Sequence, residues 1–320
     1  MSPTLLIENL TNPALLFFML GILAVILKSD LEIPHNSSKF ISLYLLFSIG
    51  FRGGQELAHE TPSTEMFISL LFGMLLSLLI PVYTFFILRK RFSVYDAGAI
   101  AASYGSISAV TFITATAYLE THHEHLHGHM VAVMALMEAP AIVSGLILIN
   151  AFAPASQFQR IRKRDALKHA LTNGSVMLIL GSLIIGVLAS AEQAQGIKPF
   201  TTDLFKGFLA IFLLDMGIES GRKLRNFFQY GWFPVVFALL IPLFNGTGAT
   251  LLSSMFTDDV SNRFMFGVLA ASASYIAVPA AIKVSVPQAN PGIFLPMALA
   301  ITFPLNITLG FPLYAHLAGM

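Results

Sequence analysis

Long apolar segments, separated by short polar ones, make up most of the chain. At about 17 to 25 residues, such segments are long enough to cross the apolar core of a bilayer as helices. Ten spans of this kind lie near residues 13–28, 38–57, 66–88, 95–118, 130–152, 174–191, 200–220, 230–255, 262–284 and 291–318. The pattern therefore predicts an all-α membrane protein with ten transmembrane helices.

Two of these spans are polar at their centres. The fourth contains Ser-Tyr-Gly-Ser-Ile-Ser at residues 103–108, and about 169 residues later the ninth contains Ser-Ala-Ser-Tyr at residues 272–275. We predict that the fourth span breaks at Gly105 and the ninth at Pro279, whose ring removes a backbone donor. In lipid, the backbone groups freed by a break must be satisfied by protein, water or a ligand.

The two halves of the chain resemble each other. Residues 46–57 match residues 213–224 position for position, and residues 134–140 match residues 297–304. Because each half holds five spans and five is odd, the second copy must enter the membrane from the opposite face. We therefore predict two inverted five-helix repeats, an architecture that suits alternating access between two related conformations.

The lysine and arginine residues lie mostly on one side of this topology. If the N-terminus is outside, fourteen of the 18 face inside, and the four that do not are Arg52, Lys198, Lys206 and Arg263. This bias predicts a plasma (inner) membrane protein with both termini outside, on the periplasmic face. The first repeat is then residues 1–153, followed by a cytoplasmic linker at residues 154–173 and the second repeat at residues 174–320. We interpret the basic linker as a topology determinant, with binding of a regulator or of anionic lipid as the alternative.

Composition agrees with this class and removes several others. The chain is 56% hydrophobic and 11% charged with a mean hydropathy of +0.76, whereas soluble domains are about 25% charged. A net charge of +1 and no basic patch with interleaved aromatic residues argue against nucleic-acid binding. The absence of cysteine excludes disulfides, thiol chemistry and thiolate metal sites. The first apolar run has no basic segment before it, so we interpret it as a retained span.

The two polar centres are candidates for an anion site. A broken helix exposes unpaired N–H groups at the N-terminal end of its second half, which carries roughly half a positive charge. Two such ends that face each other can bind an anion without an arginine. The predicted substrate-binding residues are Gly105, Ser106, Ile107, Ser108, Ser272, Ala273, Ser274 and Tyr275. The alternative is that these small residues only let helices pack closely.

Two carboxylic acids lie within apolar spans. Glu138 is in the fifth span and Asp215 in the seventh, and a charge at the bilayer centre costs at least about 2.5 to 3.5 kcal/mol. A sodium ion or a proton would balance these charges. The predicted cation-binding residues are Ser103, Thr111, Glu138, Asp215, Thr302 and Asn306. For Asp215 the alternatives are a wetted position near the inner end of its span, or a structural bond to a hydroxyl.

A histidine-rich loop connects the fourth and fifth spans. It contains His122, His123, His125, His127 and His129, together with Glu120 and Glu124. Histidines at such spacings can bind zinc. We nevertheless favour a solvated loop without a metal.

Several segments together resemble the sodium-dependent bicarbonate transporter family, known best from cyanobacteria, and the wider bacterial permease superfamily around it. The segments are residues 104–112, 137–141, 216–219, 270–275 and 287–291. The resemblance implies a ten-span inverted repeat with a core part and a gate part, a homotrimer, and sodium-coupled import of bicarbonate by an elevator-like motion. It also implies a cytoplasmic PII-like regulator in many members.

The chain departs from that family in three places. Glu138 stands where those transporters tend to carry aspartate, and the linker is short. Where the family resembles Ser-Ser-Asp-Ile-Ser, residues 272–277 of this chain have one carboxylate and one hydroxyl fewer. We predict a secondary transporter, not an enzyme, that imports a small anion, bicarbonate first, with sodium as the coupling ion and no other cofactor. The alternatives are another small carboxylate, an anion channel, or an intramembrane hydrolase.

Overall fold

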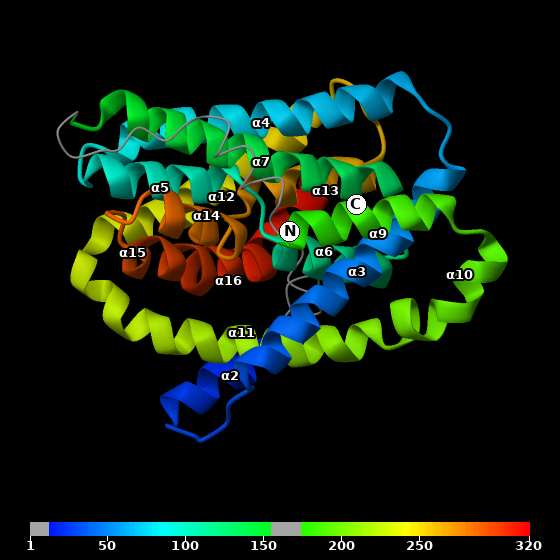
Figure 1. Ribbon diagram of the computed structural model, residues 1–320, viewed down its shortest axis with the longest axis horizontal. Helices are drawn as coiled ribbons and strands as arrows, with labels where there is room; N and C mark the ends of the chain where they lie inside the picture. The colour runs from blue at the N-terminus through cyan, green and yellow to red at the C-terminus, as the bar shows by residue number, and fades with distance from the viewer. Residues whose placement is uncertain (1–12, 155–173) are drawn as a thin grey trace.

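The computed structural model describes residues 13–154 and 174–320 (Figure 1). These residues form helices joined by short connections, and no strand occurs among them. The predicted linker lies outside these residues except for its first position. The helices of the first half are α2 (Pro13–Ile26), α3 (His35–His59), α4 (Thr64–Leu88), α5 (Val94–Gly105), α6 (Ala109–Thr121) and α7 (Gly128–Phe152).

The second half is more subdivided. It contains α9 (Gly174–Leu188), α10 (Ala191–Lys198), η1 (Pro199–Asp203), α11 (Phe205–Phe227), η2 (Phe228–Tyr230), α12 (Trp232–Ser253), α13 (Val260–Ala271) and α14 (Ala277–Ser285). A continuous segment follows, built from α15 (Pro291–Pro296), η3 (Met297–Thr302), α16 (Phe303–Leu305), η4 (Asn306–Gly310) and α17 (Phe311–Ala318). Pro296, Pro304 and Pro312 remove backbone donors along this segment, and η3 and η4 are π-helical.

Five stretches are long and apolar enough to cross a membrane. They are Thr64–Leu88, Val94–Thr121, Gly128–Phe152, Trp232–Ser253 and Pro291–Ala318; the apolar helices Leu15–Ile26 and Met177–Leu188 are shorter. Along α4, Phe67, Leu71, Leu75 and Leu79 are exposed on one face, as expected for contact with lipid. The chain thus has the character of a multi-pass membrane protein, and the number of ten crossings stays a prediction.

Polar side chains mark where several helices begin. Ser63 accepts a hydrogen bond from the Met66 N–H at 3.1 Å at the start of α4, and Ser93 does the same for Asp96 at the start of α5. Asp259 accepts one from the Asn262 N–H at 2.8 Å at the start of α13. These caps satisfy backbone donors that have no partner within the helix.

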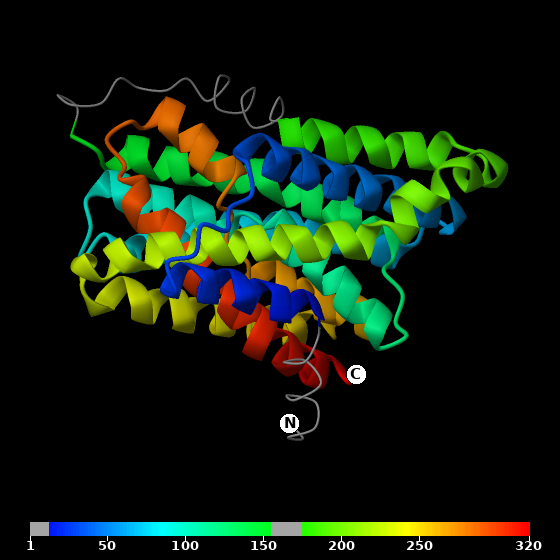
Figure 2. The same cartoon turned by 90° about the horizontal axis from the view of Figure 1, so that it is seen from below.

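Two helix pairs, α2 with α11 and α3 with α9, form one side of the molecule (Figure 2). Both pairs approach closely at glycines. A Cβ atom at Gly217 would lie 2.1 Å from the carbonyl oxygen of Phe18 in α2, and one at Gly54 would lie 2.1 Å from that of Leu183 in α9. These positions therefore exclude any larger residue.

The remaining helices form a second group. Within it, α4 packs against α5 and α7, while α12 packs against α13 and α17. The two halves meet where α6 contacts α13 and α14 contacts α5. α6, which follows the first polar centre, thus packs against α13, which precedes the second. In the same way α14, which follows the second centre, packs against α5, which precedes the first.

Candidate functional site

Non-helical segments occur at both polar centres. α5 ends at Gly105 and α6 begins at Ala109, while α13 ends at Ala271 and α14 begins at Ala277. The second segment thus precedes Pro279, which lies in the first turn of α14, where a missing N–H breaks no helical bond. The break therefore lies before Pro279 and not at the predicted position, Pro279 itself.

The helix bounds also correct the register of the two centres. α5 and α13 are both 12 residues long, and their first residues, Val94 and Val260, are 260 − 94 = 166 residues apart. The sequence comparison had suggested about 169. Ser106 then corresponds to Ser272, and Ser108 to Ser274.

The two segments are bonded to each other. The Ser108 N–H donates to Ser272 Oγ at 3.0 Å, and the Ser274 N–H donates to the Ser103 carbonyl at 2.8 Å. Ser272 Oγ in turn donates to the Leu269 carbonyl at 2.9 Å. The hydroxyl of Ser272 is therefore used in joining the segments.

A small pocket, with room for about one water molecule, lies at this junction. It brings together five of the predicted site residues, namely Ile107, Ser108, Ser274, Tyr275 and Glu138. The rest of its lining consists of Leu46, Ala109, Val110, Ile276 and Ala277. Residues from four separate parts of the chain thus share one pocket.

Helix N-termini form part of the pocket wall. Ala109 and Val110 begin α6, and Ala277 begins α14; in an α-helix the N–H groups at these positions have no intrahelical acceptor. The next donors are capped, since Thr111 N–H bonds to Ser108 Oγ at 3.1 Å and Val278 N–H to Ser274 Oγ at 3.3 Å. The wall therefore offers partial positive charge from two helices.

Glu138 lies in α7 and is only 6% exposed. Its carboxyl group has no hydrogen bond or ion pair with any residue in the described ranges. Pro140, two residues further on, removes an N–H donor from the same part of α7. A buried carboxylate without a protein partner is a strong candidate for binding a cation.

Three further hydroxyls near the first centre are buried without a partner. They belong to Ser103, Ser106 and Thr111, and none bonds to the described part of the chain. Leaving such a group unpaired costs about 1 to 3 kcal/mol. Although these residues are not part of the pocket lining, they lie just before, within and after the first non-helical segment.

Gly105 and Ala273 have structural surroundings. A Cβ atom at Gly105 would lie 2.1 Å from Cγ of Pro81 in α4, so the glycine allows this close approach. Ala273 is 2% exposed and does not line the pocket.

Thr302 and Asn306 lie in the π-helical part of the C-terminal segment and are bonded to protein. Thr302 Oγ1 donates to the Ala238 carbonyl at 2.9 Å and is 2.8 Å from the Tyr104 hydroxyl. Asn306 Nδ2 donates to the Ala271 carbonyl at 2.8 Å. Asn306 therefore satisfies the last carbonyl of α13.

Asp215 lies apart from the pocket. Its carboxylate accepts a hydrogen bond from the hydroxyl of Ser38 in α3. This arrangement matches the alternative interpretation, in which Asp215 bonds to a hydroxyl.

Apart from Ile107, the sequence did not indicate the apolar part of the lining. Leu46 comes from α3 and Ile276 from the second non-helical segment. An apolar residue in an apolar span carries no signal that distinguishes it from its neighbours.

The model of the Na⁺-dependent bicarbonate transporter superfamily matches residues 13–319 of the chain. This range includes both halves and every residue of the pocket. A comparison with curated proteins finds no match.

Proposed function

This chain belongs to the Na⁺-dependent bicarbonate transporter superfamily, and from that premise we propose that it is a sodium-coupled secondary transporter of a small anion, bicarbonate first. The observation that carries the proposal is the pocket in which Ser108 and Ser274 meet Glu138 beside the starts of α6 and α14. It combines donors for an anion with a carboxylate for a cation.

The anion would lie against the N-terminal ends of α6 and α14. The N–H groups of Ala109, Val110 and Ala277 provide partial positive charge, and Tyr275 adds a hydroxyl to the residues that line the pocket. A site built from backbone dipoles needs no permanent positive charge, so the anion can also leave.

Sodium coupling follows from Glu138. With its carboxylate ionised and unpaired, the pocket repels an anion; a bound Na⁺ cancels that charge and makes the partial charges of the helix ends effective. The unpaired hydroxyls of Ser103, Ser106 and Thr111 provide further oxygen ligands near the first segment. Cation binding first and anion binding second is thus the favoured order.

The proposed architecture is a ten-span inverted repeat that moves by alternating access. Its support is the matched packing of the two halves. α2 packs on α11 as α9 packs on α3, and α4 packs on α5 and α7 as α12 packs on α13 and α17. We propose that the α2, α3, α9 and α11 group is the gate, that the other group is the core, and that both termini are outside an inner membrane.

A second candidate substrate is a small carboxylate. Leu46, Ile107 and Val110 give the pocket an apolar side, which would suit a short hydrocarbon chain next to a carboxylate group. Bicarbonate has no such part.

The test is uptake into proteoliposomes that contain the purified chain. Labelled bicarbonate and a series of labelled small carboxylates are supplied at alkaline pH, where little CO₂ is present, with and without an inward sodium gradient. We expect saturable uptake of one of them that depends on sodium. Flux that never saturates would instead favour a channel, and uptake equal to that of empty liposomes for all the anions would contradict the proposal.

A further inference from the structure

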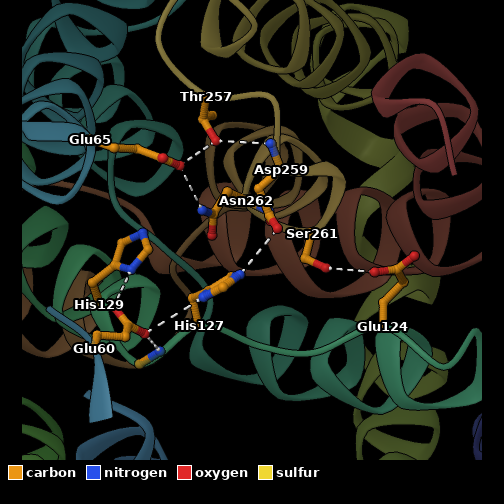
Figure 3. A network of polar contacts seen from close by, with 10 residues as sticks. Glu60, Glu65, Glu124, His127, His129, Thr257, Asp259, Ser261 and Asn262 are labelled. Atoms are coloured by element: carbon orange, nitrogen blue, oxygen red, sulfur yellow. Dashed lines mark hydrogen bonds and ion pairs between the residues drawn. The ribbon is translucent and has the colours of Figure 1, made fainter. Parts of the chain in front are cut away.

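Two histidines at the start of α7 contact carboxylates, whereas the sequence favours a solvated loop. His123 and His125 are exposed, but His129 is 5% exposed and its Nδ1 lies 2.7 Å from Glu60 Oε2 (Figure 3). His127 Nε2 lies 3.1 Å from Asp259 Oδ2, and its Nδ1 lies 3.8 Å from Glu60 Oε1. The cluster thus joins the end of α3 to the starts of α7 and α13.

Gly128, between the two histidines, fixes their position. A Cβ atom there would lie 2.3 Å from both the Gly53 carbonyl oxygen and the Leu57 nitrogen of α3. The Gly128 N–H also donates to Glu60 Oε1 at 2.6 Å. The backbone is therefore held against α3, with one histidine on each side of Glu60.

The cluster has the ligands of a zinc site. Each of Glu60, His127 and His129 offers one ligand atom, and these atoms lie within 4.8 Å of one another. Two imidazoles and one carboxylate suit Zn²⁺, which accepts a water molecule as its fourth ligand. Asp259 bonds to the outer nitrogen of His127, as carboxylates commonly do to orient a metal-binding imidazole.

The charge around the cluster favours a cation. Glu60, Asp259 and nearby Glu65 are acidic, and the labelled network in Figure 3 contains no lysine or arginine.

The protein alone does not satisfy His129. Its Nε2 is buried and has no partner in the described part of the chain. It is not the nitrogen that faces Glu60, which is Nδ1, so His129 would bind an ion beside Glu60 through Nδ1 alone.

We propose that Glu60, His127 and His129 form a Zn²⁺ site, with Asp259 as the residue that positions His127. The ion replaces the proton shared by His129 and Glu60, and so ties the end of α3 to the starts of α7 and α13. Because α7 also carries Glu138, the ion would hold the helix that bears the proposed sodium ligand. Binding of zinc does not depend on which anion is transported.

The experiment measures Zn²⁺ binding to the full chain, purified in detergent without a polyhistidine tag and stripped with a chelator. Equilibrium dialysis with metal analysis is expected to give one tightly bound ion per chain. His127→Gln and His129→Gln should each weaken binding by at least about 10- to 100-fold, the loss that is usual even for residues that only orient a ligand. Asp259→Asn should weaken it by about tenfold.

The matched control uses histidines of the same loop that lie outside the cluster. His123→Asn combined with His125→Ala should leave the affinity unchanged; asparagine suits position 123, where φ is +59°. If the His129→Gln variant does not fold, the His127→Gln variant still tests the proposal, because the His127 side chain is 38% exposed and its replacement should be tolerated. The proposal would be overturned if the wild type did not bind zinc stoichiometrically, or if His127→Gln bound it with unchanged affinity. Loss of zinc binding in the control variant would also overturn it.

Discussion

The surroundings of Glu138 in α7 and those of Thr302 and Asn306 in the C-terminal segment differ in one respect. Sequence comparison matches Glu138 with Thr302, each of which precedes a proline. The carboxyl group of Glu138 faces a pocket and bonds to none of the described residues, whereas Thr302 and Asn306 are bonded to Tyr104, Ala238 and Ala271.

The difference teaches that related positions in two similar halves need not share a role. On one side, the polar group remains available for a ligand. On the other, the polar groups satisfy the carbonyl of Ala271 and hold the C-terminal segment against α5 and α12. We therefore expect substitution of Glu138 to change transport, and substitution of Thr302 or Asn306 to change stability.

Glu138→Gln should have the largest effect. It keeps the size of the side chain but removes its charge, so activation of uptake by sodium should fall by about 10- to 100-fold, the factor that corresponds to about 1.5 to 3 kcal/mol for a contact with a charged group. The measurement is initial uptake against sodium concentration in proteoliposomes. Thr302→Val is the matched control and should retain the sodium dependence; a normal sodium response in Glu138→Gln would remove Glu138 from the cation site.

Asn306→Leu should lower the free energy of unfolding by about 1 to 3 kcal/mol, because it leaves the buried Ala271 carbonyl without a donor. Thermal unfolding in detergent gives the change. Ser254→Ala is the control, since this exposed hydroxyl bonds only to a carbonyl of its own helix region, and its effect should stay within about 0.5 kcal/mol. If Asn306→Leu and the control were equally stable, the hydrogen bond from Asn306 to the Ala271 carbonyl would not contribute to stability.

Ser108→Ala should cost about 1 kcal/mol, the usual effect of removing a helix cap. Since Ser108 also lines the pocket, uptake should need a higher concentration of the anion. Thermal unfolding and the concentration dependence of uptake separate the two effects. A change in stability with an unaltered concentration dependence would assign Ser108 to structure alone.

Ser106→Ala should have the smallest effect on stability, within about 0.5 kcal/mol, because its hydroxyl has no partner to lose among the described residues. Weaker sodium activation with unchanged thermal unfolding is expected. A large loss of stability would mean that the Ser106 hydroxyl is engaged by protein, and would argue against its role as an ion ligand.

Part of the site could be predicted from local signals. Hydroxyl residues in the middle of apolar spans marked both non-helical segments, and a carboxyl group beside a proline in an apolar span marked Glu138. The predicted set also included Asp215 and Asn306, which the structure bonds to Ser38 and Ala271 instead. A polar residue in an apolar span indicates that a partner is needed, but not whether the partner is protein or ligand.

The distant members of both sites could not be predicted. Leu46 reaches the pocket from α3, and Glu60 reaches His127 and His129 from the end of the same helix. Neither residue differs in type from many others in its surroundings. Their roles follow from how α3 packs against α7 and α9.

The amino-acid sequence by itself determined the all-helical class, the membrane character and the family, because apolar length and the order of motifs are local properties of the chain. Only the tertiary structure decided which polar groups pair with each other and which face a cavity. The physical reason is that a hydroxyl or carboxylate in an apolar span must find a partner, and the choice among partners more than a hundred residues away depends on how the helices pack.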